Sequence, residues 1–435
     1  MKIGILGGGL SGLTLGYLLS QKDIDFEILE KDCECGGLMR TREDAGFTFD
    51  CAGSHIIFSR NEESLNFILN LLQNNKVRTR RETRVLYDGR YVKYPFENGL
   101  SDLSKNDNFD CLFSFVQNLI KKEKGEIGKP VNLQEWFYYT FGSGISEKYL
   151  IPYNEKIWKF PTDQMGLDWV ERVPDPPMGD IIKSSLGIET EGYRHQLFFY
   201  YPRVGGIQAI IKVFEEEIKE HIVTNFEITQ VNKVNKWSVS DGKQEKQFDK
   251  IVSTIPIQNL INVMNAPKNE KKAVDNLKYN SLICVMIGLN SEKLNDLSWL
   301  YIPDKEILTH RISFPSNYSP KVAPKGKSAV LAEITCDKNS SLWNMSDNEL
   351  KEKVIENLYL LKIIDKSDVC FAEVSRSEYA YVISDLDYKK NLTIAQDYAA
   401  EQGLNLLGRF GEFKYMNMDE CIQSAMNCAN KILSN

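Results

Sequence analysis

The stretch MKIGILGGGLSGLTLGYLLSQKDIDFEILEKDCECGGLMRT, residues 1–41, decides the fold. Its first apolar run, Lys2–Leu6, is typical of a buried parallel strand, and Leu13–Ser20 has the spacing of a helix. Between them comes the pattern G-x-G-x-x-G, formed by Gly7, Gly9 and Gly12. Such glycines permit a tight turn, a close approach of backbone N–H groups and close packing of helix on strand. The stretch therefore predicts a strand, turn and helix that hold a pyrophosphate at the helix N-terminus.

A second predicted strand, Phe26–Leu29, ends at an acidic residue. This residue, Glu30, follows Gly12 at about the distance at which a carboxylate binds a ribose hydroxyl in dinucleotide-binding folds. A carboxylate at this position disfavours a 2′-phosphate, so the site does not suit NADP. We therefore predict a Rossmann-like α/β fold that binds a dinucleotide.

Composition limits the class of protein. The chain has 435 residues, which suggests two interleaved domains, and a net charge of −7 with scattered lysines and arginines. That charge argues against a nucleic-acid or anionic-membrane surface. No apolar run is long enough for a membrane span, and we expect a cytoplasmic protein. The nine cysteines and four histidines are spread without the spacing of a metal site, so we predict no metal.

We expect a second domain to be inserted twice into the dinucleotide-binding domain. Residues 1–60, 201–260 and 403–435 are assigned to the latter, 61–200 to a mainly helical substrate or lid region, and 261–402 to a substrate-binding sheet. The elements behind this assignment include a helix at Ile207–Ile218, strands at Ile222–Val231, Ile251–Ile255 and Leu404–Leu407, and a helix at Met418–Leu433. In the sheet region, Ile283–Leu289 and Ser328–Ile334 are predicted as strands that alternate apolar and polar residues.

A second glycine motif bears on which dinucleotide is bound. The segment Cys35–Thr41, CGGLMRT, contains a Gly-Gly pair followed by a basic residue and a threonine. Together with the first motif, this segment resembles the second fingerprint of the FAD-dependent amine oxidase and protoporphyrinogen oxidase superfamily. The resemblance implies FAD rather than NAD, and a Rossmann-like domain of the glutathione reductase type with interleaved helical and antiparallel-sheet substrate regions.

Segments farther along the chain narrow the resemblance. They are Asp50–Ser59, which places small residues beside His55, then Tyr94–Glu97, Pro152–Trp158 followed by Arg172, Trp299–Tyr301 followed by Arg311, Tyr381, and Gly408–Tyr415. In this order they resemble the UDP-galactopyranose mutase family, more its eukaryotic type than its usual bacterial type. The resemblance implies an isomerase that interconverts pyranose and furanose forms of a UDP-sugar through attack of reduced flavin N5 on the anomeric carbon, in cell-surface polysaccharide biosynthesis.

The resemblance also implies roles for individual residues. His55, Arg172 and Arg311 would act in catalysis. Substrate contacts would come from Tyr94, Phe96, Glu97, Asn154, Trp158, Arg172, Tyr301, Arg311, Tyr381 and Tyr415. Cofactor contacts would come from Gly7, Gly9, Leu10, Ser11, Gly12, Glu30, Gly36, Gly37, Leu38, Arg40, Gly53, Ser54, Ile228, Gly408, Arg409, Met418 and Asp419.

Elementary chemistry agrees with a nucleotide-sugar ligand. The planar guanidinium of arginine binds phosphate oxygens bidentately, so two arginines and several tyrosines suit a diphosphate better than an amine. The flavin must be reduced before it can act, and NADPH or NADH are candidate donors. Whether the chain forms a homo-oligomer is left open.

Two other functions stay open at this point. One is a flavin-dependent oxidoreductase that acts on a small amine, porphyrinogen or polyene, which would share the fold and both glycine motifs. The other is a flavin-binding protein without catalysis. Three residues depart from the usual pattern of the mutase family, namely Ser54, Glu97 and Val382, and these bear on the identity of the sugar and on the reaction.

Overall fold

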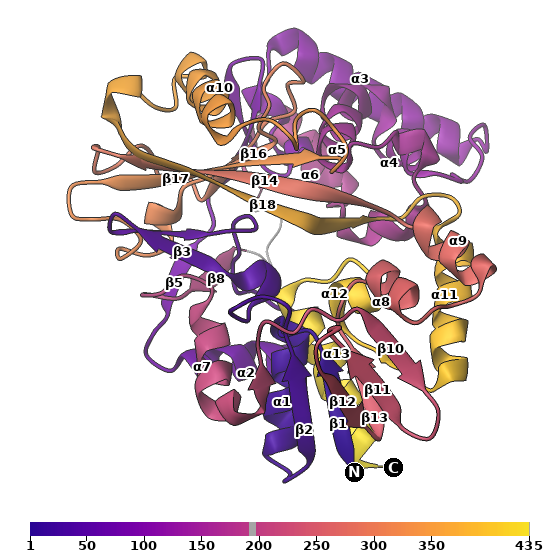
Figure 1. Cartoon of the computed structure of the whole chain (residues 1–435). Helices are drawn as coiled ribbons and strands as arrows, with labels where there is room; N and C mark the ends of the chain where they lie inside the picture. Colours follow the sequence, from indigo (N-terminus) through magenta and orange to yellow (C-terminus); the bar gives the residue numbers. More distant parts are fainter. Residues whose placement is uncertain (191–196, 435) are drawn as a thin grey trace.

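The computed structural model describes residues 1–190 and 197–434. Figure 1 shows a large sheet across the middle of the molecule, with the part that contains both chain ends below it. The large sheet has seven strands, and the part below contains a five-stranded parallel sheet. This arrangement confirms the predicted α/β class with an additional antiparallel sheet.

The parallel sheet is built around β1 (Lys2–Leu6). Its order is β19 (Asn405–Leu406), β13 (Lys250–Ser253), β1, β2 (Asp25–Leu29) and β9 (Ile222–Val223). Apolar residues fill both faces, because helices cover one side and a small sheet the other. The helices are α1 (Leu10–Ser20), α2 (Glu62–Leu72), α7 (Ala209–Ile218) and α13 (Met418–Leu433), whose apolar side chains form one buried cluster with those of β1 and β2.

The small sheet is an antiparallel meander of β10 (Gln230–Lys233), β11 (Trp237–Ser240) and β12 (Glu245–Phe248). It packs so closely that a Cβ on Gly4 of β1 would lie 2.7 Å from the Phe248 ring. The single strand predicted for Ile222–Val231 is wrong. The chain leaves the parallel sheet after β9 and enters the meander at β10, turning at Asn225, which has a φ of +56°. Apolar residues on both sides of this turn hide it in the sequence.

The seven-stranded sheet carries the long strands of the second region. Its order is β18 (Val369–Ile383), β14 (Lys278–Leu289), β17 (Ser328–Cys336), β16 (Arg311–Ser313), β15 (Trp299–Tyr301), β6 (Thr83–Tyr87) and β7 (Arg90–Lys93). The alternation expected along these strands is wrong for both examples, because β17 is buried at every position and β14 is buried throughout Ile283–Leu289. Helix α10 (Asp347–Leu360) covers one face, and the antiparallel pair β3 (Thr41–Asp44) and β4 (Phe47–Asp50) packs on the other.

Helices gather at one end of the large sheet (Figure 1). They are α3 (Lys105–Glu123), α4 (Leu133–Ile145), α5 (Ile151–Trp158) and α6 (Met178–Ser185). The region 61–200 also contributes strands, because β6 and β7 join the large sheet and β5 (Val77–Arg80) pairs with β8 (Phe198–Tyr201). Among the described residues, no helix combines the length and apolarity that crossing a membrane requires.

The helix α2 packs with α13 and α7 in the core of the parallel sheet, although it follows residue 60. We therefore propose that the dinucleotide-binding domain extends through α2.

The remaining α-helices of the described residues are α8 (Ile257–Val263), α9 (Lys268–Asn276), α11 (Tyr388–Gln402) and α12 (Gly408–Gly411). The strand predicted for Ile251–Ile255 is observed as β13, which ends at Ser253, and α8 begins directly after Pro256.

Candidate functional site

A cavity of about 910 Å³ lies between the parallel sheet and the seven-stranded sheet. At one side it is lined by the loops that follow β1, β2 and β13, the carboxyl ends of the parallel strands. At the other side it is lined by side chains of β14, β15, β16 and β18. Ligands of open parallel sheets bind at this end of the strands.

The first glycine motif forms a cradle beneath this cavity. Gly7 has a φ of +105°, and a Cβ on Gly12 would lie 2.1 Å from the carbonyl oxygen of Gly7. A Cβ on Gly9, in contrast, would meet no atom within 4 Å. The backbone ahead of α1 is therefore open toward the cavity, which fits a pyrophosphate at the helix N-terminus.

Two further glycine segments complete the cradle. Gly36 donates its N–H to the carbonyl of Gly8 at 2.9 Å, and the adjoining Gly37 has a φ of +54°. A Cβ on Gly408 would lie 2.3 Å from Oγ of Ser11, so this glycine lets α12 approach α1. Three glycine-rich segments far apart in the sequence thus leave backbone, rather than side chains, at the cavity wall.

Glu30 lies at the end of β2 and is 6 % exposed. Its Oε2 accepts the N–H of Gly8 at 2.8 Å, and its Oε1 accepts the N–H of Asp32 at 3.0 Å. Arg40 is held close by, 2.7 Å from Asp32 and 3.9 Å from Glu30. The carboxylate therefore faces the cavity in a fixed orientation that suits a ribose hydroxyl.

Arg409 supplies a cationic group whose hydrogen-bonding capacity the described residues leave partly unused. Its Nε and one Nη are buried without a hydrogen-bond partner among the described residues, and the other Nη donates to the carbonyl of Met416 at 3.3 Å. The residue lines the same cavity as the glycine cradle. Buried polar groups are normally paired, so an unpaired guanidinium indicates an anionic ligand in this cavity. The donor set and the cradle together fit FAD.

His55 lies on the wall between the two sheets. Its Nδ1 is 2.8 Å from the carbonyl oxygen of Gly53, which can only accept, so Nδ1 carries the proton and Nε2 is left as an acceptor. Burial, with the positive charges of Arg311 and Arg409, lowers the pKa of His55 to about 4. The imidazole is therefore neutral at physiological pH.

Arg311 projects from β16 and is held by a carboxylate that the sequence analysis did not single out. Its Nε and Nη2 donate to the two oxygens of Glu333 at 2.8 and 2.6 Å, a bidentate pair, and Glu333 is fully buried. Burial opposes the charge of Arg311 but Glu333 outweighs it, so the pKa of Arg311 lies well above its ordinary value. Among the described residues, Nη1 makes no hydrogen bond. Arg311 is thus fixed and can bind an anion in the cavity.

Glu333 also organises the loop that contains His55. It accepts the N–H of Ser54 at 3.2 Å, and a Cβ on Gly53 would lie 2.8 Å from its Oε2. Gly53 does not line the cavity but lets this loop approach the carboxylate. In the sequence, Glu333 is marked only as a lone acid inside an otherwise apolar strand.

Two tyrosines form an aromatic wall beside the arginines. The rings of Tyr381 and Tyr415 are nearly parallel, with centroids 6.0 Å apart. The guanidinium of Arg409 lies 4.3 Å from the Tyr415 ring centroid and 5.3 Å from that of Tyr381. Cation–π contacts of this kind fix the guanidinium over the rings.

Arg172 contacts this wall without lining the cavity. Its Nη2 is 2.6 and 2.7 Å from the two oxygens of Glu420, and its guanidinium lies 5.1 Å from the Tyr415 ring centroid. The pairing with Glu420 is partly exposed, so it restrains the arginine only weakly.

The far end of the cavity is aromatic. Tyr301 packs against Tyr94 and Tyr153, with centroids 5.1 Å away in both pairs. Arg81 and Trp299 also line this end, and the Arg81 guanidinium lies 4.7 Å from the Trp299 ring centroid. Arg81 lies outside every segment singled out in the sequence, whereas Trp299 was named there only as the start of Trp299–Tyr301, without a role.

The predicted residues divide into two groups by position. Those that line the cavity are Gly7, Gly9, Leu10, Ser11, Glu30, Gly36, Gly37, Leu38, Arg40, Ser54, His55, Tyr94, Ile228, Tyr301, Arg311, Tyr381, Gly408, Arg409, Tyr415 and Met418. Those outside its lining are Gly12, Gly53, Phe96, Glu97, Asn154, Trp158, Arg172 and Asp419. Asp419 accepts a hydrogen bond from Ser59 at 2.6 Å instead.

Four of these outer residues are buried, and two of them, Trp158 and Asn154, lie behind the aromatic wall. Trp158 packs edge-on against Tyr381 and Tyr415 and donates its indole N–H to Asn154 at 3.2 Å. Phe96 is fully buried in the core. Glu97 is 1 % exposed, and burial raises its pKa to about 8, so it is largely protonated at neutral pH. A direct substrate contact from any of them stays a prediction.

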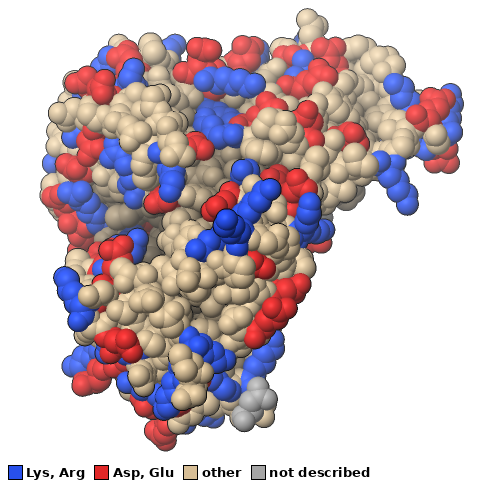
Figure 2. Space-filling view, turned by 45° about the vertical axis from the view of Figure 1, so that its right-hand side comes forward, with Lys and Arg blue, Asp and Glu red and all other residues tan. Residues whose placement is uncertain are grey.

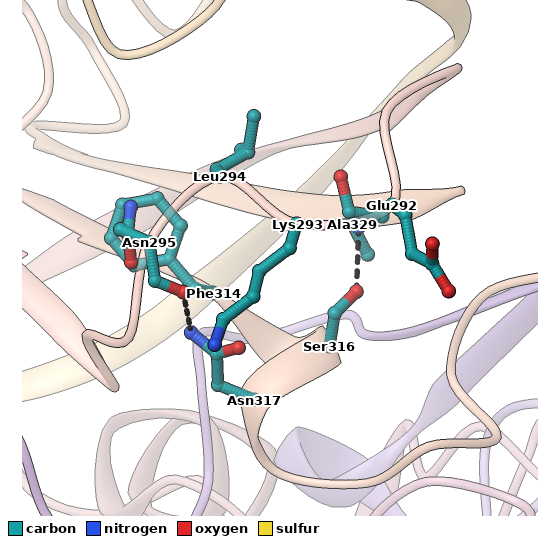
Figure 3. Close-up of a pocket in the computed structure, with 9 residues that line it drawn as sticks. Glu292, Lys293, Leu294, Asn295, Phe314, Ser316, Asn317 and Ala329 are labelled. Carbon is teal, nitrogen blue, oxygen red and sulfur yellow. Dashed lines mark hydrogen bonds between the residues drawn. The ribbon is translucent and has the colours of Figure 1, made fainter. Parts of the chain in front are cut away.

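A second, smaller hollow of about 350 Å³ lies between the segment after β14, Phe314 and the start of β17. Figure 3 shows Lys293 extended across it, with Ser316 hydrogen-bonded to the backbone N–H of Ala329. It contains none of the predicted site residues. Over the face shown in Figure 2, acidic and basic side chains intermingle.

In the described part of the chain, no three His, Cys, Asp or Glu residues are arranged to hold a metal ion. His195 lies outside the described residues. All nine cysteines have free thiols.

The similarities of this chain to known proteins agree with a cavity that binds a flavin. The family model described as flavin containing amine oxidoreductase matches residues 10–433. A crystal structure of reduced UDP-galactopyranose mutase superposes with a TM-score of 0.91 at 25% identity, covering 100% of this chain and 94% of that one.

Two further similarities have lower identity. The dTDP-fucopyranose mutase of Escherichia coli is 19% identical over 453 residues, which span 100% of this chain and 99% of that protein. A putative protoporphyrinogen oxidase from an Exiguobacterium species has a TM-score of 0.79 at 16% identity, covers 100% of this chain and 99% of that one, and shows the fold alone. These findings confirm the fold class and the resemblance expected from the sequence.

Proposed function

The chain belongs to the family of flavin-containing amine oxidoreductases, and we propose that within this family it is a nucleotide-sugar mutase. It would interconvert the pyranose and furanose forms of a UDP-sugar such as UDP-galactose. The cofactor is FAD, which the glycine cradle, Glu30 and the unpaired Arg409 fit. The similarity to two sugar mutases supports this function.

The observation that carries the proposal is the charge of the cavity. Arg311 and Arg409 both line it, and within the part of the chain that the structure describes, buried nitrogens of Arg409 lack a hydrogen-bond partner. FAD brings one pyrophosphate, and a sugar nucleotide brings a second. Two fixed guanidinium groups donate hydrogen bonds to such anions, whereas they offer no acceptor to the ammonium group of an amine-oxidase substrate. The alternative, an amine-oxidising enzyme, therefore fits the cavity less well.

The protein residues would divide the work of the reaction. When bound and reduced, FAD supplies a nucleophilic nitrogen, N5, at the anomeric carbon. Arg311 would bind the diphosphate and stabilise the negative charge that develops as it leaves. Arg172 would add a second cation if it exchanged Glu420 for the phosphate, since that pairing is partly exposed.

His55 and the tyrosines would orient the sugar. The neutral imidazole of His55 presents Nε2 as an acceptor and can hold the proton of a hydroxyl at that atom. Tyr381 and Tyr415 would contact the diphosphate, and Tyr94 and Tyr301 would pack against the base or sugar. These roles come from the resemblance found in the sequence, and the four tyrosines and His55 all line the same cavity.

The proposal also covers the electron donor and the compartment of the enzyme. NADH or NADPH would reduce the flavin, because the interconversion itself supplies no electrons. We place the enzyme in the cytoplasm, because the nine free thiols suit a reducing compartment.

The test is an anaerobic turnover experiment with the FAD-loaded protein. The protein is reduced with dithionite, UDP-galactopyranose or UDP-galactofuranose is added, and the nucleotide sugars are separated by chromatography. We expect interconversion with reduced flavin and none with oxidised flavin. If neither sugar changes and none of several other nucleotide sugars binds, the proposal fails, and substrates that bleach the oxidised flavin should then be sought.

A further inference from the structure

Lys156 of α5 is a buried lysine without a carboxylate partner. The residue is 5% exposed, and among the described residues it makes no ion pair. Lysine is almost never this buried unless it is paired, because the removal of an ammonium group from water is costly. Lys156 is not part of the lining of the large cavity. Its burial therefore requires partners of another kind.

The partners of Lys156 are three backbone carbonyls. Its Nζ donates to the carbonyl oxygens of Ile302 at 2.9 Å, of Asp304 at 2.6 Å and of Thr309 at 2.8 Å. Three such hydrogen bonds need three N–H donors, which the charged ammonium form has and the neutral amine lacks. The geometry therefore corresponds to a charged lysine that acts on the backbone of another segment.

The three carbonyls come from both ends of one loop, the loop that joins β15 to β16. Ile302 directly follows Tyr301, the last residue of β15. Thr309 lies two residues before Arg311, the first residue of β16. The two strands pair over only three residues each, so their own hydrogen bonds restrain the loop weakly. Because one ammonium group binds both ends of the loop, it restrains the backbone at Tyr301 and at Arg311.

Helix α5 is itself fixed to the large sheet. It packs against β17, and the backbone carbonyl of Lys156 accepts the hydroxyl of Thr335 from that strand at 3.1 Å. Tyr153 of the same helix packs edge-on against Tyr301, with ring centroids 5.1 Å apart. The loop between β15 and β16 is thus attached to a rigid part of the molecule.

We propose that Lys156 is a positioning residue for nucleotide-sugar binding, which holds this loop so that Tyr301 and Arg311 face the cavity. The inference rests on the function proposed above. Glu333 fixes the guanidinium of Arg311, and Lys156 fixes the backbone that leads into Arg311. Together they leave the diphosphate-binding group little freedom, so less conformational entropy is lost when the ligand binds.

The charged groups on the elements packed against Lys156 are largely paired. Glu155 of the same helix pairs with Lys305 of the loop at 3.5 Å. Arg311 of β16 pairs with Glu333 of β17 at 2.6 Å. These pairs keep the net charge around the ammonium group small, so the carbonyls of the loop are its main electrostatic partners.

The proton of Lys156 offers a diagnostic of its role. Burial and the positive charge of Lys159 lower the pKa of Lys156 to about 7, against the opposing effect of Asp304. His310, buried beside them, has a pKa well below its ordinary value and stays neutral. Loss of the proton removes one of the three N–H donors. An anion bound at Arg311 favours charged Lys156, so the affinity for that anion should fall as the pH rises through 7.

The first test follows the loop by hydrogen exchange in the FAD-loaded protein. The N–H of Ile302 donates to the carbonyl of His310 at 2.9 Å and should be protected. In Lys156→Met, which keeps the apolar stem without a donor, peptides that cover residues 299–313 should exchange about tenfold faster. Lys305→Met removes only an exposed ion pair of the same loop and should exchange as the wild type does. Equal exchange in Lys156→Met and the wild type would overturn the inference.

The second test measures the affinity of UDP-galactose for the oxidised, FAD-loaded protein through the flavin absorbance. At about pH 6, Lys156→Met should bind about tenfold more weakly than the wild type, with equal flavin content. As the pH rises, the wild-type affinity should fall toward that of the variant. Glu97, with a pKa of about 8, titrates in the same range but is present in both proteins. The ratio of the two affinities therefore reports Lys156, and a ratio independent of pH would contradict its positioning role.

The two tests separate this inference from the proposed function. If the wild type bound no nucleotide sugar, the proposed function would fail, whereas hydrogen exchange would still decide whether Lys156 holds the loop. If the wild type bound UDP-galactose and Lys156→Met bound it equally tightly, the inference alone would fail.

Discussion

The two ends of the cavity are built in different ways. At the cofactor end, a short segment of chain forms the main part of the site: strand, glycine turn, helix and Glu30 lie within the first thirty residues. At the substrate end, the side chains of Tyr94, Tyr301, Arg311 and Tyr381 come from separate strands or loops. The comparison shows that the backbone shape of one local segment determines cofactor binding. Substrate binding depends instead on side chains that come together only when separate strands form the sheet.

The largest expected effect is at the cofactor end. Gly12→Val should abolish FAD binding, because even a Cβ would lie 2.1 Å from the carbonyl oxygen of Gly7 and push α1 away from the turn. The measurement is the flavin absorbance that remains with the protein after gel filtration. Gly128→Ala, where a Cβ meets no atom within 4 Å, should keep its flavin. A yellow Gly12→Val protein would contradict the cradle.

The next effect is at the substrate end. Glu333→Ala strands the buried charge of Arg311 and should lower the free energy of unfolding by about 3–5 kcal/mol. The free energy is measured by urea denaturation with FAD in excess. Glu43→Ala, on an exposed part of β3, is the control and should change it by less than about 0.5 kcal/mol. An equally small change for Glu333→Ala would mean that Arg311 does not depend on this carboxylate.

A smaller effect is expected from Arg172→Ala. Because Arg172 contacts Tyr415 and Glu420 outside the cavity lining, the variant should keep FAD and raise KM for the sugar nucleotide by about tenfold. Steady-state kinetics measure this change. Lys236→Ala, which removes an exposed ion pair with Asp249, should leave KM unchanged. Loss of FAD with an unchanged KM would assign Arg172 to the cofactor end instead.

A further effect concerns pH. Folding lowers the pKa of His55 from about 6.5 to about 4, so the folded state resists protonation. The contribution of neutral His55 to stability is therefore complete above pH 6.5 and is lost as the pH falls toward 4. His55→Gln should flatten the pH dependence of the unfolding free energy in this window. An unchanged slope would show that His55 titrates normally in the folded protein.

The difference between the two ends also explains what could be predicted from the sequence. The glycine cradle and Glu30 were predictable, because a motif fixes local backbone geometry. Glu333 was not, because its role depends on the pairing of β16 with β17, which brings it beside Arg311. Arg81 was missed for the same reason, since the segments that lead into β6 and β15 meet only in the folded sheet. Trp299 was named in the sequence analysis but was given no role.

The same reasoning applies to the fold. Helix α13 was predicted with its observed bounds, Met418–Leu433, because its amphipathic pattern is local. The single strand predicted for Ile222–Val231 is wrong, because the passage of the chain from one sheet to another at Asn225 depends on contacts that exist only in the folded protein. The uninterrupted burial of β17 depends on α10 and β4, which cover its two faces from other parts of the chain.

The most direct test of the central claim is a titration of the FAD-loaded protein with UDP, followed through the flavin absorbance spectrum. The claim is that Arg311 binds a nucleotide diphosphate in the cavity that also holds the flavin. The account predicts saturable binding to the wild type and at least tenfold weaker binding to Arg311→Ala, with equal flavin content in both. Equal UDP affinity in the two proteins, or loss of flavin from the variant, would contradict it.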